Sequence, residues 1–93
     1  MSHDEYTWKE VSKVFDEVEG ELYTAVGKFP PMRSAHEAYA IIHEETDELW
    51  DAVKGNKGDG SLEAQRKEAI QVAAMAIRFV LDISDKGKHR NER

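Results

Sequence analysis

Cysteine is absent from this sequence of 93 residues. Disulfide bonds, thiolate metal sites and thiol nucleophiles are therefore excluded. A chain of this length has room for one domain, and its core is marginal because folding at this size buries only roughly 60–65% of the chain's surface. Without disulfides, self-association is the remaining common way to bury more apolar area. We expect a single domain over residues 1–93 that forms at least a dimer.

Long apolar stretches and an excess of basic residues are also missing. The longest mainly apolar run, residues 70–83, is interrupted by polar side chains and is too short to span a bilayer. The first five residues are polar and acidic, unlike a signal peptide. The net charge of −6 argues against a broad contact with the phosphate backbone of DNA or RNA. We therefore expect a soluble, cytoplasmic protein that binds neither a membrane nor a nucleic acid polymer.

Proline and glycine are few, and their positions divide the chain into helical segments. Apolar residues spaced three and four apart predict a first helix over about residues 4–26, ended by Gly27 and by the two prolines that follow it. A second helix is predicted over residues 33–54, with Ser34 and Glu37 forming a capping box at its start. A glycine-rich segment, beginning at residue 55, stops this second helix.

The third predicted helix covers residues 61–84, with Ser61 or Asp59 as its N-cap. This helix is apolar nearly all round, so its apolar surface must be buried on several sides. Two other helices of the same chain cannot bury all of it. No window alternates with a period of two, so no sheet is expected. The predicted fold class is all-α: a bundle of three to four helices per chain, completed by dimerisation. The basic tail, residues 86–93, is interpreted as a solvated end, or alternatively as an arm that steers phosphate or binds a partner.

Acidic residues gather in the middle of the second helix. Glu45 and Glu48 share one helix face, and so do Glu44, Glu48 and Asp51. Crowded like charges are costly, about 4 kcal/mol for two unit charges 4 Å apart at an effective dielectric constant near 20. A cation would cancel this repulsion, and oxygen ligands without cysteine select a hard ion, Mg²⁺ or Mn²⁺. The alternative is an ordinary solvated acidic helix face.

A polar seam runs along the otherwise apolar third helix. Its members follow one another at spacings of three and four, and they are Glu68, Gln71, Met75, Arg78 and Asp82. A polar seam should face other polar groups. We expect it to pack against the acidic face of the second helix. The alternative is a set of buried salt bridges, with Arg78 pairing with Asp82 and with Glu48 opposite.

Taken together, these motifs resemble the MazG-like branch of the all-α nucleotide pyrophosphohydrolases, whose pattern is Glu-x-x-Glu, a spacer, and then Glu-x-x-Asp. The matching stretches are residues 44–48 in mid-helix, the glycine-rich break, and residues 68–71 at the start of an apolar helix. The resemblance covers residues 33–83 and is particularly marked for short phage and prokaryotic members. The chain departs from the pattern at Gln71, where the family usually has Asp. A neutral amide there contributes no charge, which weakens metal affinity.

The resemblance implies hydrolysis of a nucleoside triphosphate between its α and β phosphates, giving a monophosphate and pyrophosphate with Mg²⁺ as cofactor. It makes Glu45 and Glu48 the first pair of metal ligands and Glu68 the third, with Gln71 at the fourth position. Two further carboxylates are expected to assist these residues. Glu44 would orient or deprotonate the attacking water, so that the catalytic set is Glu44, Glu45 and Glu48. Asp82 would add to the metal ligands.

Substrate and partners follow from the same resemblance. Arg78, Lys54 or Lys67 would bind the phosphates and neutralise their charge, and Trp50 or Trp8 could stack on the base. Self-association as a homodimer or a dimer of dimers is implied. A second hypothesis is a catalytically weak relative that serves as a nucleotide-binding or helical interaction module. A third is a purely structural bundle, which predicts no metal binding. The alternative for Trp8 and Trp50 is a position in the core or in an interface.

Overall fold

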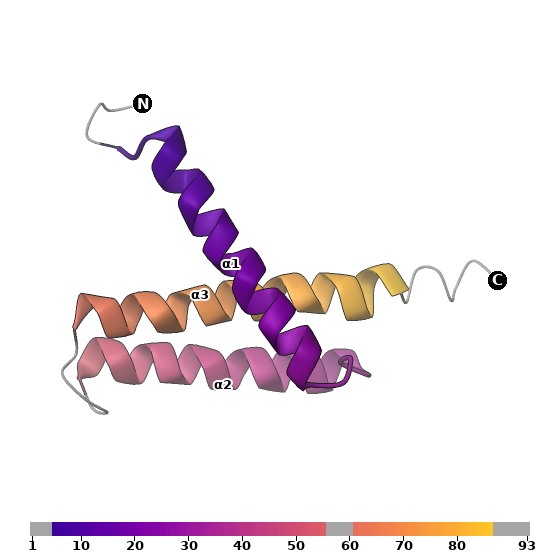
Figure 1. The fold of residues 1–93 in the computed structure, drawn as a ribbon. Coiled ribbons are helices and arrows are strands. Elements are labelled where there is room, and N and C mark those ends of the chain that lie inside the picture. The colour runs from indigo at the N-terminus through magenta and orange to yellow at the C-terminus, as the bar shows by residue number, and fades with distance from the viewer. Residues whose placement is uncertain (1–4, 56–60, 87–93) are drawn as a thin grey trace.

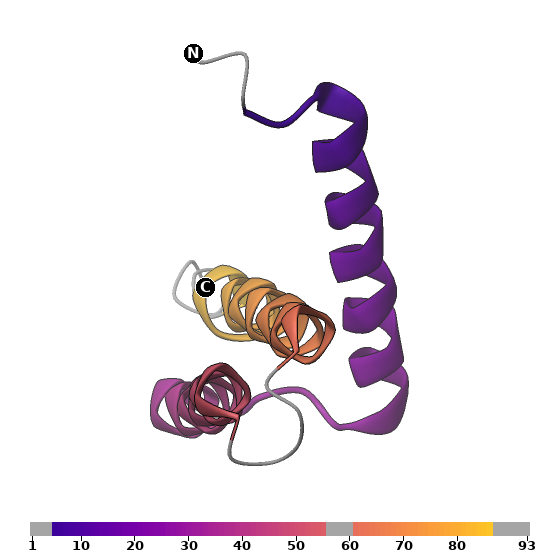
Figure 2. The same cartoon turned by 90° about the vertical axis from the view of Figure 1, so that its left-hand side faces the viewer.

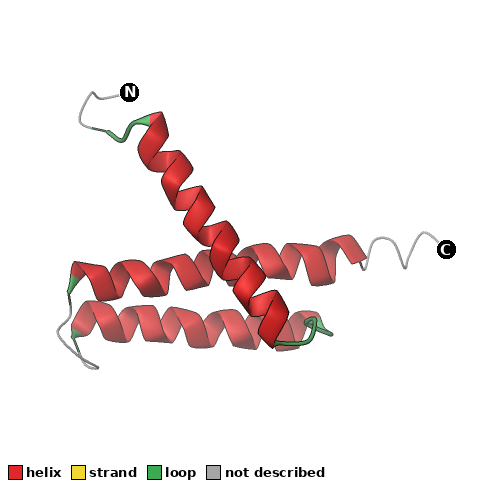
Figure 3. Cartoon of the chain, viewed as in Figure 1, coloured by secondary structure: helices red, strands yellow, loops and turns green. Residues whose placement is uncertain are grey.

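The computed structural model describes residues 5–55 and 61–86. Three helices follow one another along the chain: α1 (Trp8–Lys28), α2 (Ala35–Lys54) and α3 (Leu62–Phe79). A short π-helical segment, η1 (Val80–Asp85), continues α3. The described part of the chain contains no strand, so the all-helical prediction is confirmed (Figure 3). Among the described residues, no helix combines the length and the apolar character that crossing a membrane requires.

The helix pair α2 and α3 forms the base of the fold. These two helices lie side by side and antiparallel, and α1 crosses them obliquely (Figure 1). Viewed along the pair, α3 packs against α2 on one side and against α1 on another, and the first half of α1 projects beyond both (Figure 2). The α2–α3 interface is therefore the place where side chains of two helices can meet, while α1 is anchored by its second half.

Helix α1 begins and ends later than predicted. Thr7 is its N-cap: the Thr7 hydroxyl accepts a hydrogen bond from the backbone N–H of Glu10, and the Glu10 carboxylate accepts one from the Thr7 N–H. This capping box leaves the residues before it outside the helix. The prediction that Gly27 ends the helix is wrong, since the helix continues to Lys28. Phe29 is extended instead, because a residue that precedes proline is disfavoured in the helical region.

Helix α2 begins two residues after the predicted start and ends at the predicted residue, Lys54. The Ser34 hydroxyl accepts a hydrogen bond from the Glu37 N–H. The Glu37 carboxylate accepts from the Arg33 N–H and not from that of Ser34, so the predicted capping box is half formed. Gly55 ends the helix with φ of 77°, a left-handed conformation that glycine adopts without steric cost.

Helix α3 starts at the first of its two predicted caps. The Ser61 hydroxyl accepts a hydrogen bond from the Ala64 N–H. Residues 56–60, which include Asp59, and the tail from residue 87 onward lie outside the described residues. The predicted single helix to residue 84 is α-helical as far as Phe79 and π-helical beyond it.

The hydrophobic core is small. Its buried apolar residues come from all three helices and from the α1–α2 link, and they are Val18, Ala25, Met32, Ala38, Ala74 and Met75. Among the described residues, no large side chain is fully buried. As the sequence predicted, two neighbours do not cover α3 and its continuation, since Ile77, Val80 and Leu81 stay between 42% and 48% exposed.

Candidate metal centre

Three carboxylates from two helices converge at the α2–α3 interface. Glu45 and Glu48 on α2 and Glu68 on α3 each place one carboxylate oxygen within 4.8 Å of the other two. Glu45 and Glu48 are one helical turn apart and therefore share a face of α2. The antiparallel packing of α3 against that face brings Glu68 opposite them. These are three of the five residues that the sequence predicted as metal ligands, and the other two, Gln71 and Asp82, are not members of the cluster.

The Glu45 carboxyl group is partly shielded from solvent within this cluster. The Glu45 side chain is partly buried, and its Oε2 atom is buried without a hydrogen-bond partner. Burial is the main cause that raises the pKa of Glu45 from its ordinary 4.5 to about 7. The neighbouring Glu48 raises it further through its charge and a hydrogen bond, and the charges of Glu68 and Glu44 add to the effect. Few positive charges or hydrogen-bond donors near Glu45 therefore stabilise its ionised form.

The spacing of the cluster suits a small divalent cation. Oxygens bound to one Mg²⁺ at about 2.1 Å lie roughly 3.0 Å apart in adjacent positions and about 4.2 Å apart in opposite ones. The three oxygens lie within 4.8 Å of one another, so pairs of them would have to approach by at most about 2 Å to reach these separations. Rotations about the bonds of the Glu side chains can produce movements of this size. Three oxygen donors without nitrogen or sulfur also match the ligand preference of Mg²⁺ and Mn²⁺.

A cavity of about 330 Å³ opens beside the cluster. Glu44 and Glu45 form part of its lining, so the cavity adjoins the carboxylate cluster at Glu45. Most of the remaining wall is apolar and comes from the α1–α2 link, α2 and α3, through Phe29, Pro30, Ile41 and Met75. This wall was not predictable from the sequence, although Met75 lies on the predicted polar seam. No pattern within one helix signals a cavity that three segments build jointly.

Arg78 and Asp82 belong to a different network from the one expected. Arg78 is 4% exposed, and its Nη2 donates hydrogen bonds to the carbonyl oxygens of Phe29, at 2.8 Å, and Pro30. Asp82 accepts a hydrogen bond from the Met32 N–H at 2.9 Å and pairs with Arg78. The polar seam therefore divides: Glu68 faces the acidic side of α2, whereas Arg78 and Asp82 hold the α1–α2 link. This matches the salt-bridge alternative for that pair, and Asp82 is not a member of the carboxylate cluster.

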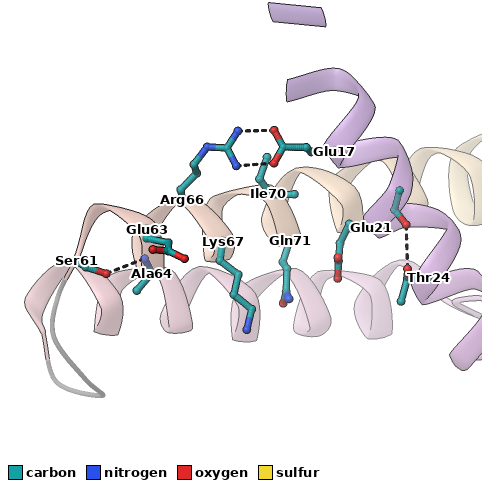
Figure 4. A pocket seen from close by; sticks show the side chains of 11 residues that line it. Glu17, Glu21, Thr24, Ser61, Glu63, Ala64, Arg66, Lys67, Ile70 and Gln71 are labelled. Carbon is teal, nitrogen blue, oxygen red and sulfur yellow. Dashed lines mark hydrogen bonds and ion pairs between the residues drawn. The ribbon is translucent and has the colours of Figure 1, made fainter. Parts of the chain in front are cut away.

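Gln71 lines a second, open pocket of about 860 Å³ between α1 and the first half of α3 (Figure 4). In the same pocket the Arg66 guanidinium forms a two-pronged ion pair with the Glu17 carboxylate, and this hydrogen bond lowers the pKa of Glu17. Lys67 also lines this pocket. Gln71 and Lys67, predicted to serve the metal and the phosphates, thus both border the α1 side of α3.

Of the remaining predicted substrate residues, Lys54 and Trp50 lie near the end of α2 and Trp8 lies at the start of α1. The Lys54 ammonium is 5.2 Å from the centre of the Trp50 ring and 3.8 Å from an Asp51 carboxylate oxygen. Trp50 is 55% exposed, and it stands two residues after Glu48, on another side of the helix. Trp8 is 75% exposed on the projecting half of α1. Neither tryptophan is a core residue.

In comparisons with known proteins, no family model matches this chain, and no curated protein or solved structure matches it either. The functional interpretation therefore depends on the geometry of the carboxylate cluster and its cavity, together with the motif resemblance in the sequence.

Proposed function

We propose that this protein is a divalent-metal-dependent nucleotide pyrophosphohydrolase of the MazG-like type. One observation carries the proposal: three carboxylates from two helices converge, and one of them keeps a buried oxygen without a hydrogen-bond partner. Buried polar atoms in folded proteins are nearly always paired, so an unpaired carboxylate oxygen among acidic neighbours indicates a missing positive ligand. The resemblance of residues 33–83 to the family's paired Glu motifs supports the same assignment.

In this proposal Glu45, Glu48 and Glu68 hold Mg²⁺, with Mn²⁺ as a substitute. The ion supplies positive charge against the phosphate oxygens during hydrolysis. Glu44 is exposed and borders the cavity next to Glu45, so its carboxylate is the group available to orient and deprotonate the attacking water. The apolar wall of the cavity provides a surface for the uncharged part of a nucleotide, and the products are a nucleoside monophosphate and pyrophosphate.

A catalytically weak nucleotide-binding module is the second candidate. The observation that favours it is Gln71, which leaves the site with three carboxylates where the family pattern has four. The two candidates share metal binding and differ in turnover. A purely structural bundle, by contrast, binds no metal.

Calorimetry with Mn²⁺ tests the metal site directly. The unmodified protein should bind the ion, and Glu48→Gln and Glu68→Gln should each weaken binding by at least tenfold while leaving helical content unchanged. Asp47→Asn is the matched control: it removes an exposed carboxylate from the same stretch of α2 outside the cluster, so it should leave affinity within about twofold. Equal isotherms for all four proteins would refute the site.

Release of pyrophosphate then separates the two candidates. We expect turnover from at least one member of a panel of canonical and damaged nucleoside triphosphates, and Glu48→Gln should abolish it. Metal and nucleotide binding without pyrophosphate release from any of them would identify the weak binding module. Turnover that survives Glu48→Gln unchanged would remove this residue from the site.

A further inference from the structure

The cavity beside Glu45 has a buried cation in its wall. Arg78 lines this cavity, together with four apolar residues and three glutamates. Among the described residues that line it, Arg78 is thus the only one with a positive charge, and its side chain is almost fully buried. A buried charge is costly unless it is paired and hydrogen-bonded. The partners of the Arg78 guanidinium therefore indicate what it can still bind.

The observed contacts of Arg78 use only part of its hydrogen-bonding capacity. A guanidinium carries five N–H donors. Both hydrogen bonds from Arg78 to the α1–α2 link come from Nη2, so they use at most two of these donors. Its Nε atom lies 3.3 Å from Asp82 Oδ2 but is buried without a hydrogen-bond partner. The link and Asp82 therefore hold the guanidinium in place and leave it with donors for an acceptor inside the cavity.

The same cavity also offers hydrogen-bond acceptors. Glu37 and Glu44 line it and belong to α2. The Glu37 carboxylate accepts a hydrogen bond from the Arg33 N–H at 3.1 Å and lies 3.6 Å from the Arg33 guanidinium. A carboxylate has about four acceptor sites, so Glu37 can accept further N–H groups. The cavity thus combines donors from α3 with acceptors from α2.

The size and the apolar wall of the cavity suit one flat ring system. Its volume of about 330 Å³ is near the lower end of the ~300–1,000 Å³ range of ligand pockets. This space can hold a nucleobase but not a whole nucleoside triphosphate. Phe29 lines the cavity and is 60% exposed, so its ring is accessible for stacking on a base. A base in this position would have its polar edges near Arg78 and the glutamates.

We propose that this cavity selects guanine, an inference that rests on the proposed function and names its substrate class. Guanine carries two neighbouring acceptors, N7 and O6, and an arginine side chain commonly binds both of them. Its N1–H and 2-amino groups are donors, which the carboxylates of Glu37 and Glu44 can accept. Adenine has an amino group where guanine has O6, so adenine would place a donor against the donors of Arg78.

Binding of free nucleosides tests this selectivity without metal or turnover. In chemical-shift titrations of the full chain, guanosine should bind at least tenfold more tightly than adenosine. 7-Deazaguanosine, which lacks the N7 acceptor, and inosine, which lacks the 2-amino group, should each bind about tenfold more weakly than guanosine. Nucleosides carry no phosphate, so a failure of the metal site would leave this preference intact. Equal affinities for guanosine and adenosine, or binding of neither, would overturn the inference.

The pyrophosphate-release assay separates this inference from the proposed function. GTP should be hydrolysed with a higher kcat/KM than ATP. Hydrolysis of both at equal kcat/KM would overturn the selectivity for guanine and leave the proposed function in place. A preference for guanosine in the titrations without hydrolysis of any triphosphate would retain the selectivity and refute the enzymatic proposal.

Substitution of Arg78 tests whether this residue recognises the base. Arg78→Lys keeps the positive charge but loses the fork of parallel donors, so the ratio of guanosine to adenosine affinity should fall to near one. A partly unfolded population weakens both apparent affinities by the same factor, so the ratio does not depend on stability. Arg66→Lys is the matched control, because Arg66 is on α3 but lines the α1–α3 pocket; it should leave the ratio unchanged. A ratio that Arg78→Lys leaves unchanged would overturn the inference.

Discussion

Arg78 and Asp82 form an ion pair at the junction of α3 and η1, with Arg78 Nε 3.3 Å from Asp82 Oδ2. The two side chains are 5% and 11% exposed, so the pair is largely shielded from water. Each partner also binds backbone of the α1–α2 link: Arg78 donates to two carbonyl groups, and Asp82 accepts from the Met32 N–H. The link forms part of the cavity wall beside Glu45. The Arg78–Asp82 pair therefore holds this wall in place and does not provide metal ligands.

Removing the charge of Asp82 should destabilise the fold. Asp82→Asn keeps an acceptor for the Met32 N–H but leaves the Arg78 guanidinium buried without its counter-ion. Breaking a buried pair in this way costs about 3–5 kcal/mol. We expect a decrease of about 3 kcal/mol in the free energy of unfolding, measured by urea denaturation. Asp85→Asn, an exposed substitution in the same segment, should stay within about 0.5 kcal/mol, and equal stabilities of the two variants would contradict the role of the pair.

Stability without metal should decrease as pH rises. The folded protein holds the Glu45 proton with a pKa of about 7, whereas the carboxyl group titrates near 4.5 when the chain is unfolded. The folded state therefore binds this proton more tightly, and the resulting stabilisation is complete below pH 4.5 and is lost as pH rises to about 7. Urea midpoints at pH 5.5 and 8 should show this decrease. Glu45→Gln should flatten it, and an unchanged slope in that variant would assign the effect to other groups.

Metal affinity should change with pH in the opposite direction. Mn²⁺ competes with the proton for the carboxylate of Glu45, so binding should strengthen between pH 5.5 and 8. Calorimetry in two buffers of different ionisation enthalpy would also report proton release on binding at pH 6.5. Binding that is independent of pH and releases no proton would mean that Glu45 is not a ligand.

A carboxylate at position 71 should strengthen the metal site. Gln71 follows Glu68 by one helical turn, and Gln71→Asp adds a negative charge at the position where the MazG-like pattern has Asp. We expect Mg²⁺ affinity to increase by about tenfold, corresponding to ~1.4 kcal/mol. Gln71→Leu serves as a comparison that removes the amide without adding charge. An Mg²⁺ affinity that Gln71→Asp leaves unchanged or weakens would place this residue beyond reach of the ion, in the α1–α3 pocket that it lines.

Narrowing the cavity should affect nucleotide binding without affecting the metal. Ile41 contributes to the apolar wall, and Ile41→Phe extends a larger side chain into a space of about 330 Å³. The KM for a nucleoside triphosphate should rise by about tenfold, while the Mn²⁺ isotherm stays unchanged. An unchanged KM would show that the nucleotide binds outside this cavity.

The helices and half of the site were predictable because they depend on neighbours in the sequence. Hydrophobic spacing located three helices. The Ser34 and Ser61 side chains cap the starts of α2 and α3, and Gly55 ends α2 because its backbone adopts the left-handed conformation. Glu45 and Glu48 share a face in any helix that contains both. Their pairing is therefore a property of the sequence itself.

The rotation of each helix about its axis, and the angle at which helices cross, depended on packing between distant segments. Glu68 and Arg78 stood on one predicted seam, yet Glu68 meets the acidic face of α2 and Arg78 meets the α1–α2 link, because α3 passes from one neighbour to another along its length. The oblique crossing of α1 left Trp8 and Phe15 exposed although they continue the stripe that buries Val18. Helical periodicity is local, so the sequence determined which side chains share a face. The combined packing of all three helices decides which surface each face contacts. Only the tertiary structure supplied these contacts.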